Sequence, residues 1–358
     1  MRGGCKQTEI MDRKIPIYNI YNMLCYAWDV LEEKESVPVS IDESEEMINL
    51  FTKVLLSGTR AQIRKGLDRD YVVENDELRS IKGKIDFKNS ISWMSFENAK
   101  SYCIYDEFSY DIINNQIIKS TLERLLYLQS IKSETRVDVQ NVYDYFNSVS
   151  TISIHDDTFG KVKIDRNNHN YKILLKICQL IYKNLQINEL TGEYEFSNFI
   201  EDGSQMAILF EKFVRNFYRK ELPSSVYEIG SKEPEWDLQR VNSVEAKEYL
   251  PKMKTDISVI SEGRNLIIDT KYYQNILRTN QYDTEKLHSG NLYQLFSYIK
   301  NTKSEKGQSV EGMLLYPTID KELDLEYTIQ GHKMSIRTLN LNSKDWGDIK
   351  DRLMSFVE

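Results

Sequence analysis

The stretch 251–273, PKMKTDISVISEGRNLIIDTKYY, decides the fold of the C-terminal half of the chain. Residues 255–260 alternate between apolar and polar side chains, and residues 266–268 form a short apolar run. The segment between them, SEGR at 261–264, is typical of a turn. This pattern predicts a β-hairpin.

The predicted hairpin brings two acidic side chains together. If Glu262 and Gly263 are the loop residues, the pairing counted outward from them sets Asp256 opposite Asp269. Directly paired residues have Cβ atoms roughly 4.5–5.5 Å apart, so both carboxylates can bind one divalent cation, which also relieves their repulsion. Lys271 lies two residues after Asp269 and faces the same side of the strand. Its ammonium group can position an attacking water or neutralise charge on a phosphate.

Thr270 faces the other side of this strand, but its backbone carbonyl can serve as a further metal ligand. A register shift of one residue would remove the whole arrangement. The alternative interpretation is an exposed hairpin with ordinary surface charges, because the pattern D-x-K alone is a weak signal. The placement of two carboxylates at matched ends of apolar strands favours a catalytic site over an exposed hairpin.

Two amphipathic segments flank the hairpin in sequence. SQMAILFEKFVRNFYRK predicts a helix with Glu211 at the edge of its apolar stripe. Glu211 either forms an ion pair with Arg215 at i+4 or reaches the hairpin as a metal-site residue. NLYQLFSYI predicts a second helix with Gln294 and Tyr298 on one face, which is either a half-buried edge or part of the site.

The N-terminal half is mostly helical, with one irregular segment. Apolar residues at helical spacing predict helices at 16–31, 44–56, 112–130 and 170–187. Residues 60–88 are charged and punctuated by glycine, which predicts short strands and loops projecting from the helices. This segment carries a small excess of basic residues and forms either a contact surface or a solvated hairpin.

Length and charge limit the possible functions. The 358 residues favour two domains, and the least helical stretch, 156–170, is the expected boundary. With 47 basic against 55 acidic residues the net charge is −8, which excludes a protein that holds nucleic acid by bulk charge. Most of that charge lies in residues 29–46, which contain eight acids and one lysine.

Several common features are absent from the sequence. The four cysteines are widely spaced without C-x-x-C, so neither a disulfide framework nor a zinc site is predicted. The chain has no signal peptide and no apolar run long enough for a membrane span, so we expect a soluble, cytoplasmic protein. No P-loop motif occurs, so we expect this chain to bind no nucleotide. Met11 is an alternative start to Met1, and residues 1–12 resemble a loose lead-in.

The acidic, lysine and glutamine positions together resemble a nuclease signature. In chain order, the motif positions of the PD-(D/E)xK superfamily and its Q-x-x-x-Y subgroup are matched by Glu211, Asp256, Asp269, Lys271, Gln294 and Tyr298. Asp256, Asp269 and Lys271 match the catalytic triplet of that superfamily, and Glu211 and Gln294 match its supporting positions. The signature proline is missing directly before Asp256, where Lys254 and Thr255 stand; the hairpin argument does not depend on it.

Further segments resemble one family within this superfamily. IPIYNIYNMLCYAWDVLEE, RKGLDRDY, IKGKIDF, NNQIIKSTLERLL, HSGNLYQLFSYI and GMLLYPTID are similar to the McrC family, the nuclease subunits of McrBC systems that restrict DNA containing modified cytosine. The resemblance runs from about Ile15 over nearly the whole chain.

The resemblance implies an α+β chain in two parts. The first is an N-terminal arm domain of helices and a β-hairpin, residues 1–165, which enters the central pore of a hexameric AAA+ GTPase of the McrB type. The second is a PD-(D/E)xK restriction-endonuclease-like domain, residues 166–358, with a mixed central sheet flanked by helices. The family also stimulates GTP hydrolysis by its partner, and Arg64 and Lys65 beside Gly66 are candidates for the stimulating tip, because cations can polarise a γ-phosphate.

We therefore expect a Mg²⁺-dependent DNA endonuclease subunit of a GTP-dependent restriction complex acting on double-stranded DNA with modified cytosine. Asp256, Asp269 and the Thr270 carbonyl are the predicted metal ligands, and both one-metal and two-metal reactions fit them. Cutting both strands requires two nuclease domains to meet. The competing interpretations are a non-catalytic activator of an AAA+ motor and an autonomous PD-(D/E)xK repair exonuclease.

Overall fold

The computed structural model divides the chain into two compact units. One, here called the sheet unit, consists of Met1–Asp29 and Asn198–Glu358; the other, the helical unit, is Val30–Ser197. The structure describes residues 15–32, 46–187, 194–197, 199–238, 246, 248–272, 277–279, 285–303, 307–319 and 322–357. The possible start at Met11, the lead-in 1–12 and most of the acidic stretch 29–46 lie outside these residues.

This division differs from the expected domains 1–165 and 166–358 in two places: residues 1–29 belong with the C-terminal part, and the helical unit extends to Ser197. Helix α8 (Tyr171–Asn184) belongs to the helical unit, because it packs against helices of that unit. Helix α2 (Ile17–Ala27) belongs to the sheet unit, because it packs against α9 (Gly203–Glu221). In the sequence, the helical unit is therefore inserted between the two segments that form the sheet unit.

A six-stranded mixed sheet forms the centre of the sheet unit, in the order β12-β13-β11-β8-β7-β6. Its strand β11 runs parallel to both neighbours, and the other pairs are antiparallel. The strands are β6 (Glu228–Gly230), β7 (Ile257–Ile260), β8 (Arg264–Thr270), β11 (Ser309–Thr318), β12 (Asp324–Ile329) and β13 (His332–Asn340). The remaining elements are η4 (Phe199–Glu201), the pair β9 (Leu277–Thr279) and β10 (Glu285–Leu287), α11 (Ser289–Asn301) and α12 (Trp346–Met354).

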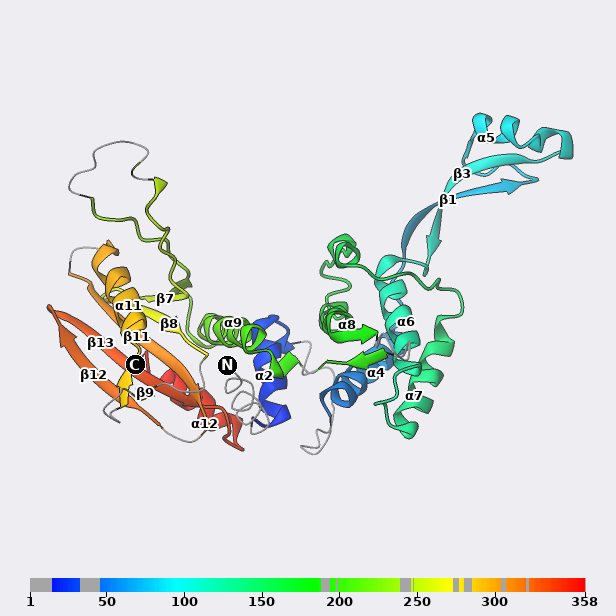
Figure 1. The fold of residues 1–358 in the computed structure, drawn as a ribbon. Coiled ribbons are helices and arrows are strands. Elements are labelled where there is room, and N and C mark those ends of the chain that lie inside the picture. The colour runs from blue at the N-terminus through cyan, green and yellow to red at the C-terminus, as the bar shows by residue number, and fades with distance from the viewer. Residues whose placement is uncertain are drawn as a thin grey trace. The chain divides into compact units, whose positions relative to one another are not determined.

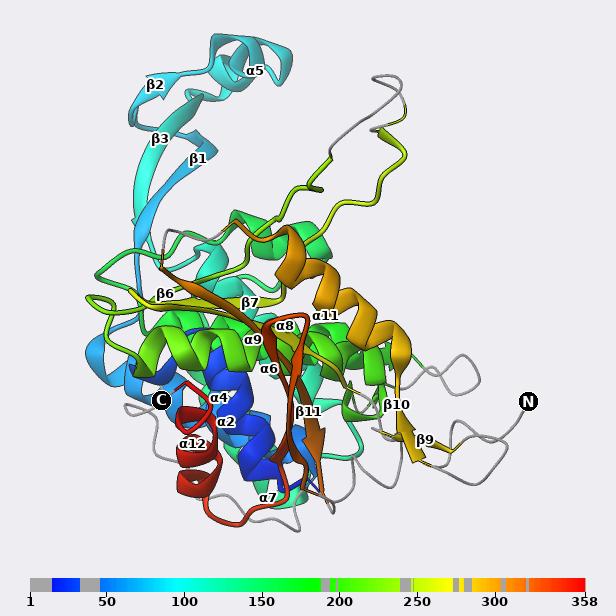
Figure 2. The ribbon, with the colours of Figure 1, turned by 90° about the vertical axis from the view of Figure 1, so that its left-hand side faces the viewer.

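Helices cover both faces of this sheet, so its central strands are apolar on both sides. On one face α11 packs over Ile267 and the apolar residues of β11 and β13. On the other face α9 packs against β6, β7 and β8, with α2 and α12 beside it (Figure 2). An aromatic cluster of Tyr26, Phe213, Phe217 and Trp346 joins these three helices.

Helix α11 lies close to the sheet at Gly312 on β11. A Cβ atom added there would lie 2.5 Å from Cδ1 of Ile299 and 2.9 Å from Cγ of Leu295. Both side chains belong to α11, so only glycine lets this helix lie so close to the sheet. The close packing sets the height of α11 above β8.

Four helices form the body of the helical unit. α4 and α6 each pack against both α7 and α8. The elements of the unit are α4 (Met47–Lys65), β1 (Asp70–Leu78), β2 (Lys84–Ile85), α5 (Phe87–Ser92), η1 (Ser95–Asn98), β3 (Ser101–Ser109), α6 (Ile113–Leu126), α7 (Ser133–Tyr143), η2 (Asp144–Phe146), η3 (Asp156–Lys161), α8, β4 (Leu185–Ile187) and β5 (Tyr194–Phe196). The predicted helices are present, but α4 continues through residues 60–65, where strands and loops were expected.

A long ribbon of β1 and β3 projects from this body and carries β2, α5 and η1 at its far end (Figure 1). The two strands contain six acidic residues and no lysine or arginine, so the basic residues of 60–88 do not lie on them. Gly83 has φ +67°, and a Cβ atom there would lie 2.3 Å from the Ile104 carbonyl oxygen. Glycine is therefore required where the chain crosses back over β3.

The far end of the ribbon exposes large apolar side chains. Those that are 62–68% exposed are Ile81, Phe87, Ile91, Trp93 and Met94. Scattered single apolar residues are normal on a surface, but such a group within fourteen residues is typical of an interaction site.

Candidate active site

The hairpin has the register that the sequence predicts. Residues 257–260 of β7 pair antiparallel with residues 265–268 of β8 in the predicted order. Asp256 directly precedes β7, and continuing this register sets it opposite Asp269. The two carboxylates therefore lie at the end of the hairpin away from its turn, close enough for the charge of Asp256 to raise the pKa of Asp269.

Asp269 is the most buried acid of the site, with 1% of its surface exposed. Lys271 reaches it from the same strand end, with Nζ 2.7 Å from Oδ2. Burial, together with the charges of Asp256 and Glu211, raises the pKa of Asp269 to about 6, even though Lys271 lowers it. Burial and like charges thus oppose ionisation of Asp269, and the lysine only partly compensates.

A chain of hydrogen bonds fixes Lys271 from α11. Lys271 Nζ donates to Gln294 Oε1 at 3.0 Å, and Gln294 Nε2 donates to the Tyr298 hydroxyl at 2.8 Å. The spacing of four residues places Gln294 and Tyr298 on one helical face, and that face meets the strand end. The predicted supporting residue Gln294 thus contacts the predicted catalytic lysine.

Asp256 has a different environment, half-buried and bound to Thr270. The Thr270 N–H and Oγ1 both donate to Asp256 Oδ2, at 2.8 and 2.9 Å. The sequence assigns Thr270 only a carbonyl ligand, which stays a prediction; the contact with Asp256 is additional.

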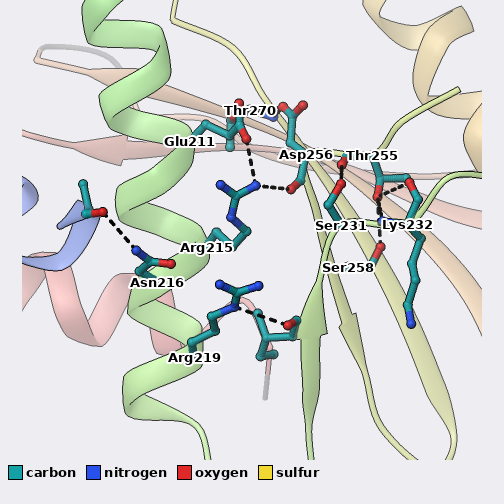
Figure 3. Close-up of polar contacts among 12 residues, drawn as sticks. Glu211, Arg215, Asn216, Arg219, Ser231, Lys232, Thr255, Asp256, Ser258 and Thr270 are labelled. Carbon is teal, nitrogen blue, oxygen red and sulfur yellow. Dashed lines mark hydrogen bonds and ion pairs between the residues drawn. The ribbon is translucent and has the colours of Figure 1, made fainter. Parts of the chain in front are cut away.

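Glu211 lies on α9 beside this strand end, as Figure 3 shows. Arg215 Nη1 donates to Glu211 Oε1 at 3.0 Å and to the Asp256 backbone oxygen at 3.4 Å. Burial and the charge of Asp256 raise the pKa of Glu211, while Arg215 lowers it. The predicted ion pair of Glu211 with Arg215 is therefore confirmed, and Glu211 also lies close enough to the two aspartates to interact with their charges. Its role as a metal-site residue stays a prediction.

The donor set suits a hard divalent cation. Among the described residues, no group of three or more His, Cys, Asp or Glu side chains is placed so that it could hold a metal ion. Mg²⁺ is usually held by only one or two carboxylates, with water and phosphate oxygens completing its shell. Asp256 and Asp269 provide two carboxylates, and a cation would offset both the burial and the repulsion that raise the pKa of Asp269. These residues therefore fit Mg²⁺.

Arg64 and Lys65 belong to the other unit. They are exposed in the last turn of α4, directly before Gly66, which ends the helix with φ 97°. Asp68 is bound to the helical body through Tyr171 and Asn115, so this part of the chain lies at the root of the ribbon. The pair therefore does not lie at the far end of the ribbon, which is residues 79–100. Its role in stimulating the partner's GTPase stays a prediction.

Three contributions were missed or left incomplete by the sequence interpretation. The sequence predicts Arg215 only as the partner of Glu211, yet it also contacts the Asp256 backbone oxygen. The Q-x-x-x-Y spacing is the sequence signal for the contact of Tyr298 with Gln294. No sequence signal indicated that the hydroxyl of Thr270 would bind Asp256.

Among the described residues, no helix has the length and apolar character needed to cross a membrane.

Comparison with known proteins gives consistent matches. A family model described as McrBC 5-methylcytosine restriction system component matches residues 8–317. The chain is 31% identical over 344 residues to the type IV methyl-directed restriction enzyme EcoKMcrBC of Escherichia coli (strain K12), which covers 96% of this chain and 97% of that protein.

A solved structure shares the fold. It is a half-complex from the tetradecameric assembly of Thermococcus gammatolerans McrB AAA+ hexamers with bound McrC. The match has a TM-score of 0.57 and 15% identity, over 96% of this chain and 76% of that one.

Proposed function

The chain belongs to the family of McrBC 5-methylcytosine restriction system components, and on this basis we propose that it is the Mg²⁺-dependent DNA endonuclease subunit of a GTP-dependent restriction complex. The observation that carries the proposal is the presence of Asp256, Asp269 and Lys271 at one end of the β7–β8 hairpin, with Lys271 paired to Asp269 and the charges of the two aspartates interacting. The substrate is double-stranded DNA containing modified cytosine.

Each residue has a distinct role in the proposed hydrolysis of a phosphodiester. Asp256 and Asp269, with the Thr270 carbonyl, would hold Mg²⁺, which as a Lewis acid stabilises the negative charge developing on the phosphate. Lys271 donates a hydrogen bond to the attacking water or to a phosphate oxygen in the transition state. Gln294 holds the lysine in place, so that little reorganisation is needed during the reaction.

The helical unit is the proposed docking element for the partner. The partner is a hexameric AAA+ GTPase of the McrB type, the kind of protein with which McrC is assembled in the structurally similar complex. The exposed apolar side chains at the far end of the β1–β3 ribbon support this role, because they would be buried on docking. In this proposal the partner binds GTP and reads the modified base, and two nuclease sites come together to cut both strands.

The test replaces Lys271 with alanine in the complete complex with its GTPase. DNA cutting should fall by at least about 10²-fold, because a preorganised donor to the transition state is lost. Stimulation of GTP hydrolysis should be retained, since Lys271 lies in the sheet unit. Lys344→Ala, which removes an exposed lysine before α12, serves as the control and should cut normally.

Other outcomes distinguish the competing functions. Unimpaired cutting by the Lys271→Ala complex would refute the catalytic assignment. A non-catalytic activator predicts that removing Mg²⁺ with EDTA and changing Asp269 to Asn both leave DNA processing unchanged. A repair exonuclease predicts degradation from DNA ends without the GTPase or GTP.

A further inference from the structure

The two aspartates of the site are held in different ways. Asp269 is paired with the ammonium group of Lys271. Asp256 is held by Thr270, whose N–H and hydroxyl converge on the same oxygen, Oδ2. Among the described residues, no donor is found on the other oxygen of Asp256, Oδ1.

Two donors on one oxygen fix the orientation of a carboxylate. Hydrogen bonds to an ionised acceptor are short and strong, and both of these are below 3.0 Å. The rotation of the Asp256 carboxylate about its terminal bond is otherwise broad, so the bonds select one orientation from many. Oδ2 is thereby committed to Thr270, and Oδ1 remains the oxygen available to a ligand.

This arrangement depends on where β7 begins. Thr270 and Asp269 point to opposite faces of β8, so their side chains cannot serve the same face of the sheet. Asp256 precedes the first paired residue of β7, Ile257, so its side chain can reach the N–H and hydroxyl of Thr270. The last two residues of β8 and the residue after it thus have three different roles. Asp269 supplies a carboxylate, Thr270 donates to the carboxylate of Asp256, and Lys271 supplies an ammonium group.

We propose that the Thr270 side chain is a positioning residue of the nuclease site: its hydroxyl orients Asp256 so that Oδ1 is presented to the divalent cation. The inference rests on the proposed function, which places Mg²⁺ at Asp256 and Asp269. It assigns the side chain a task separate from the predicted ligand role of the Thr270 carbonyl. Carboxylate ligands of metals are in turn held by hydrogen bonds, and losing such a bond typically weakens metal affinity about 10–100-fold.

The test measures Mg²⁺ binding to the full-length chain without DNA or GTPase, by titration calorimetry and by the Mg²⁺-dependent shift in unfolding temperature. Thr270→Val keeps the shape and the N–H but removes the hydroxyl, so Mg²⁺ affinity should fall about tenfold. Thr270→Ser keeps the hydroxyl and should stay near wild type. Thr270→Ala removes the same hydroxyl without a branched side chain and should repeat the loss, which covers poor folding of the valine variant.

A matched control separates positioning from general damage. Thr338→Val removes another hydroxyl of the sheet unit. Thr338 lies on β13, two strands from β8, and its hydroxyl accepts from Leu323 N at 2.8 Å rather than bonding to either aspartate. It should leave Mg²⁺ affinity unchanged even if the unfolding temperature falls.

The outcomes also separate this inference from the proposed function. Wild-type Mg²⁺ affinity in both Thr270→Val and Thr270→Ala, alongside weakened binding in Asp256→Ala, overturns the role of Thr270 and leaves the proposed site standing. Unchanged binding in both Asp256→Ala and Asp269→Ala overturns the metal site, and the Thr270 inference with it.

Discussion

At the scale of single residues, ionised Asp269 is needed for the proposed metal site but destabilises the folded protein in the absence of a metal. Its pKa in the folded protein, about 6, lies above the ordinary value for aspartate because the carboxylate is buried beside other acids. A raised folded-state pKa means that the protonated form favours folding. The contribution of Asp269 to the free energy of unfolding should therefore be most favourable below about pH 4 and should be lost as the pH rises through about 6.

Asp269→Asn mimics the neutral acid, so it should stabilise the metal-free chain. The expected gain in unfolding free energy is about 1–3 kcal/mol at roughly pH 8, shrinking towards about pH 4. Urea unfolding over this pH range measures it. Added Mg²⁺ should stabilise the wild type and leave the variant nearly unaffected, whereas a variant less stable than wild type at alkaline pH would contradict this account.

The register that sets Asp256 opposite Asp269 could be predicted, because the hairpin loop has two residues and the strand pairs can be counted outward from it. The bond from Thr270 to Asp256 could not, because strand periodicity separates the two side chains until the strand ends. Contact between Lys271 and Gln294 depends on the height of a helix above a strand, which no local pattern encodes.

At the scale of elements, Gly312 controls the distance between α11 and the sheet. Gly312→Ala would force its Cβ against Leu295 and Ile299, and overpacking of this kind costs about 1–3 kcal/mol. Because the displaced helix carries Gln294, DNA cutting should fall together with stability. The urea midpoint and the cutting rate measure the two effects.

Gly290 provides the matched control for this substitution. It lies in the first turn of the same helix, and nothing is within 4 Å of an added Cβ atom. Gly290→Ala should stabilise the protein by about 0.4–1 kcal/mol, because alanine restricts the unfolded chain. Equal stability of Gly312→Ala and wild type would show that α11 moves aside without cost.

Element boundaries were predicted well where apolar spacing is regular and poorly where it stops. The sequence predicts α6, α8, α9 and α11 to within a few residues. It ends α4 too early, because residues 60–65 are rich in charge, although arginine and lysine are good helix formers on an exposed face.

At the scale of the whole molecule, the proposed function assigns partner stimulation to the helical unit and DNA cutting to the sheet unit. We predict that replacing both Arg64 and Lys65 with alanine lowers stimulation of the partner's GTPase by at least about tenfold, because cations can stabilise charge around a γ-phosphate. The complex should still assemble, and Mg²⁺ binding by the sheet unit should be unchanged. GTP turnover by the assembled complex is the measurement.

A control pair for this experiment is Lys163→Ala with Arg166→Ala, which removes two other exposed cations of the helical unit. It should stimulate normally. Full stimulation by the Arg64 and Lys65 variant would instead direct attention to residues 79–100 at the far end of the ribbon.

The two-part organisation was predictable from length and pattern, but its boundary was not. The apolar stripe of residues 16–31 predicts a buried helix without indicating which core buries it. Contacts with residues nearly two hundred or more positions away place this helix in the sheet unit. The Asn19 side chain donates to the Leu341 and Ser343 carbonyl oxygens, and the Tyr26 hydroxyl donates to Glu221.

The placement of α2 has a consequence for synthesis on the ribosome. Its partner α9 is translated only after the whole helical unit, a delay of roughly 10–30 s at ordinary elongation rates. During that time the nascent chain exposes the apolar face of α2, including Ile20 and Leu24, while the helical unit can already fold. If the site acts as proposed, the sheet unit that carries it is completed only after α2 packs against the late-translated α9, so cutting activity should arise after the proposed partner-binding unit has formed.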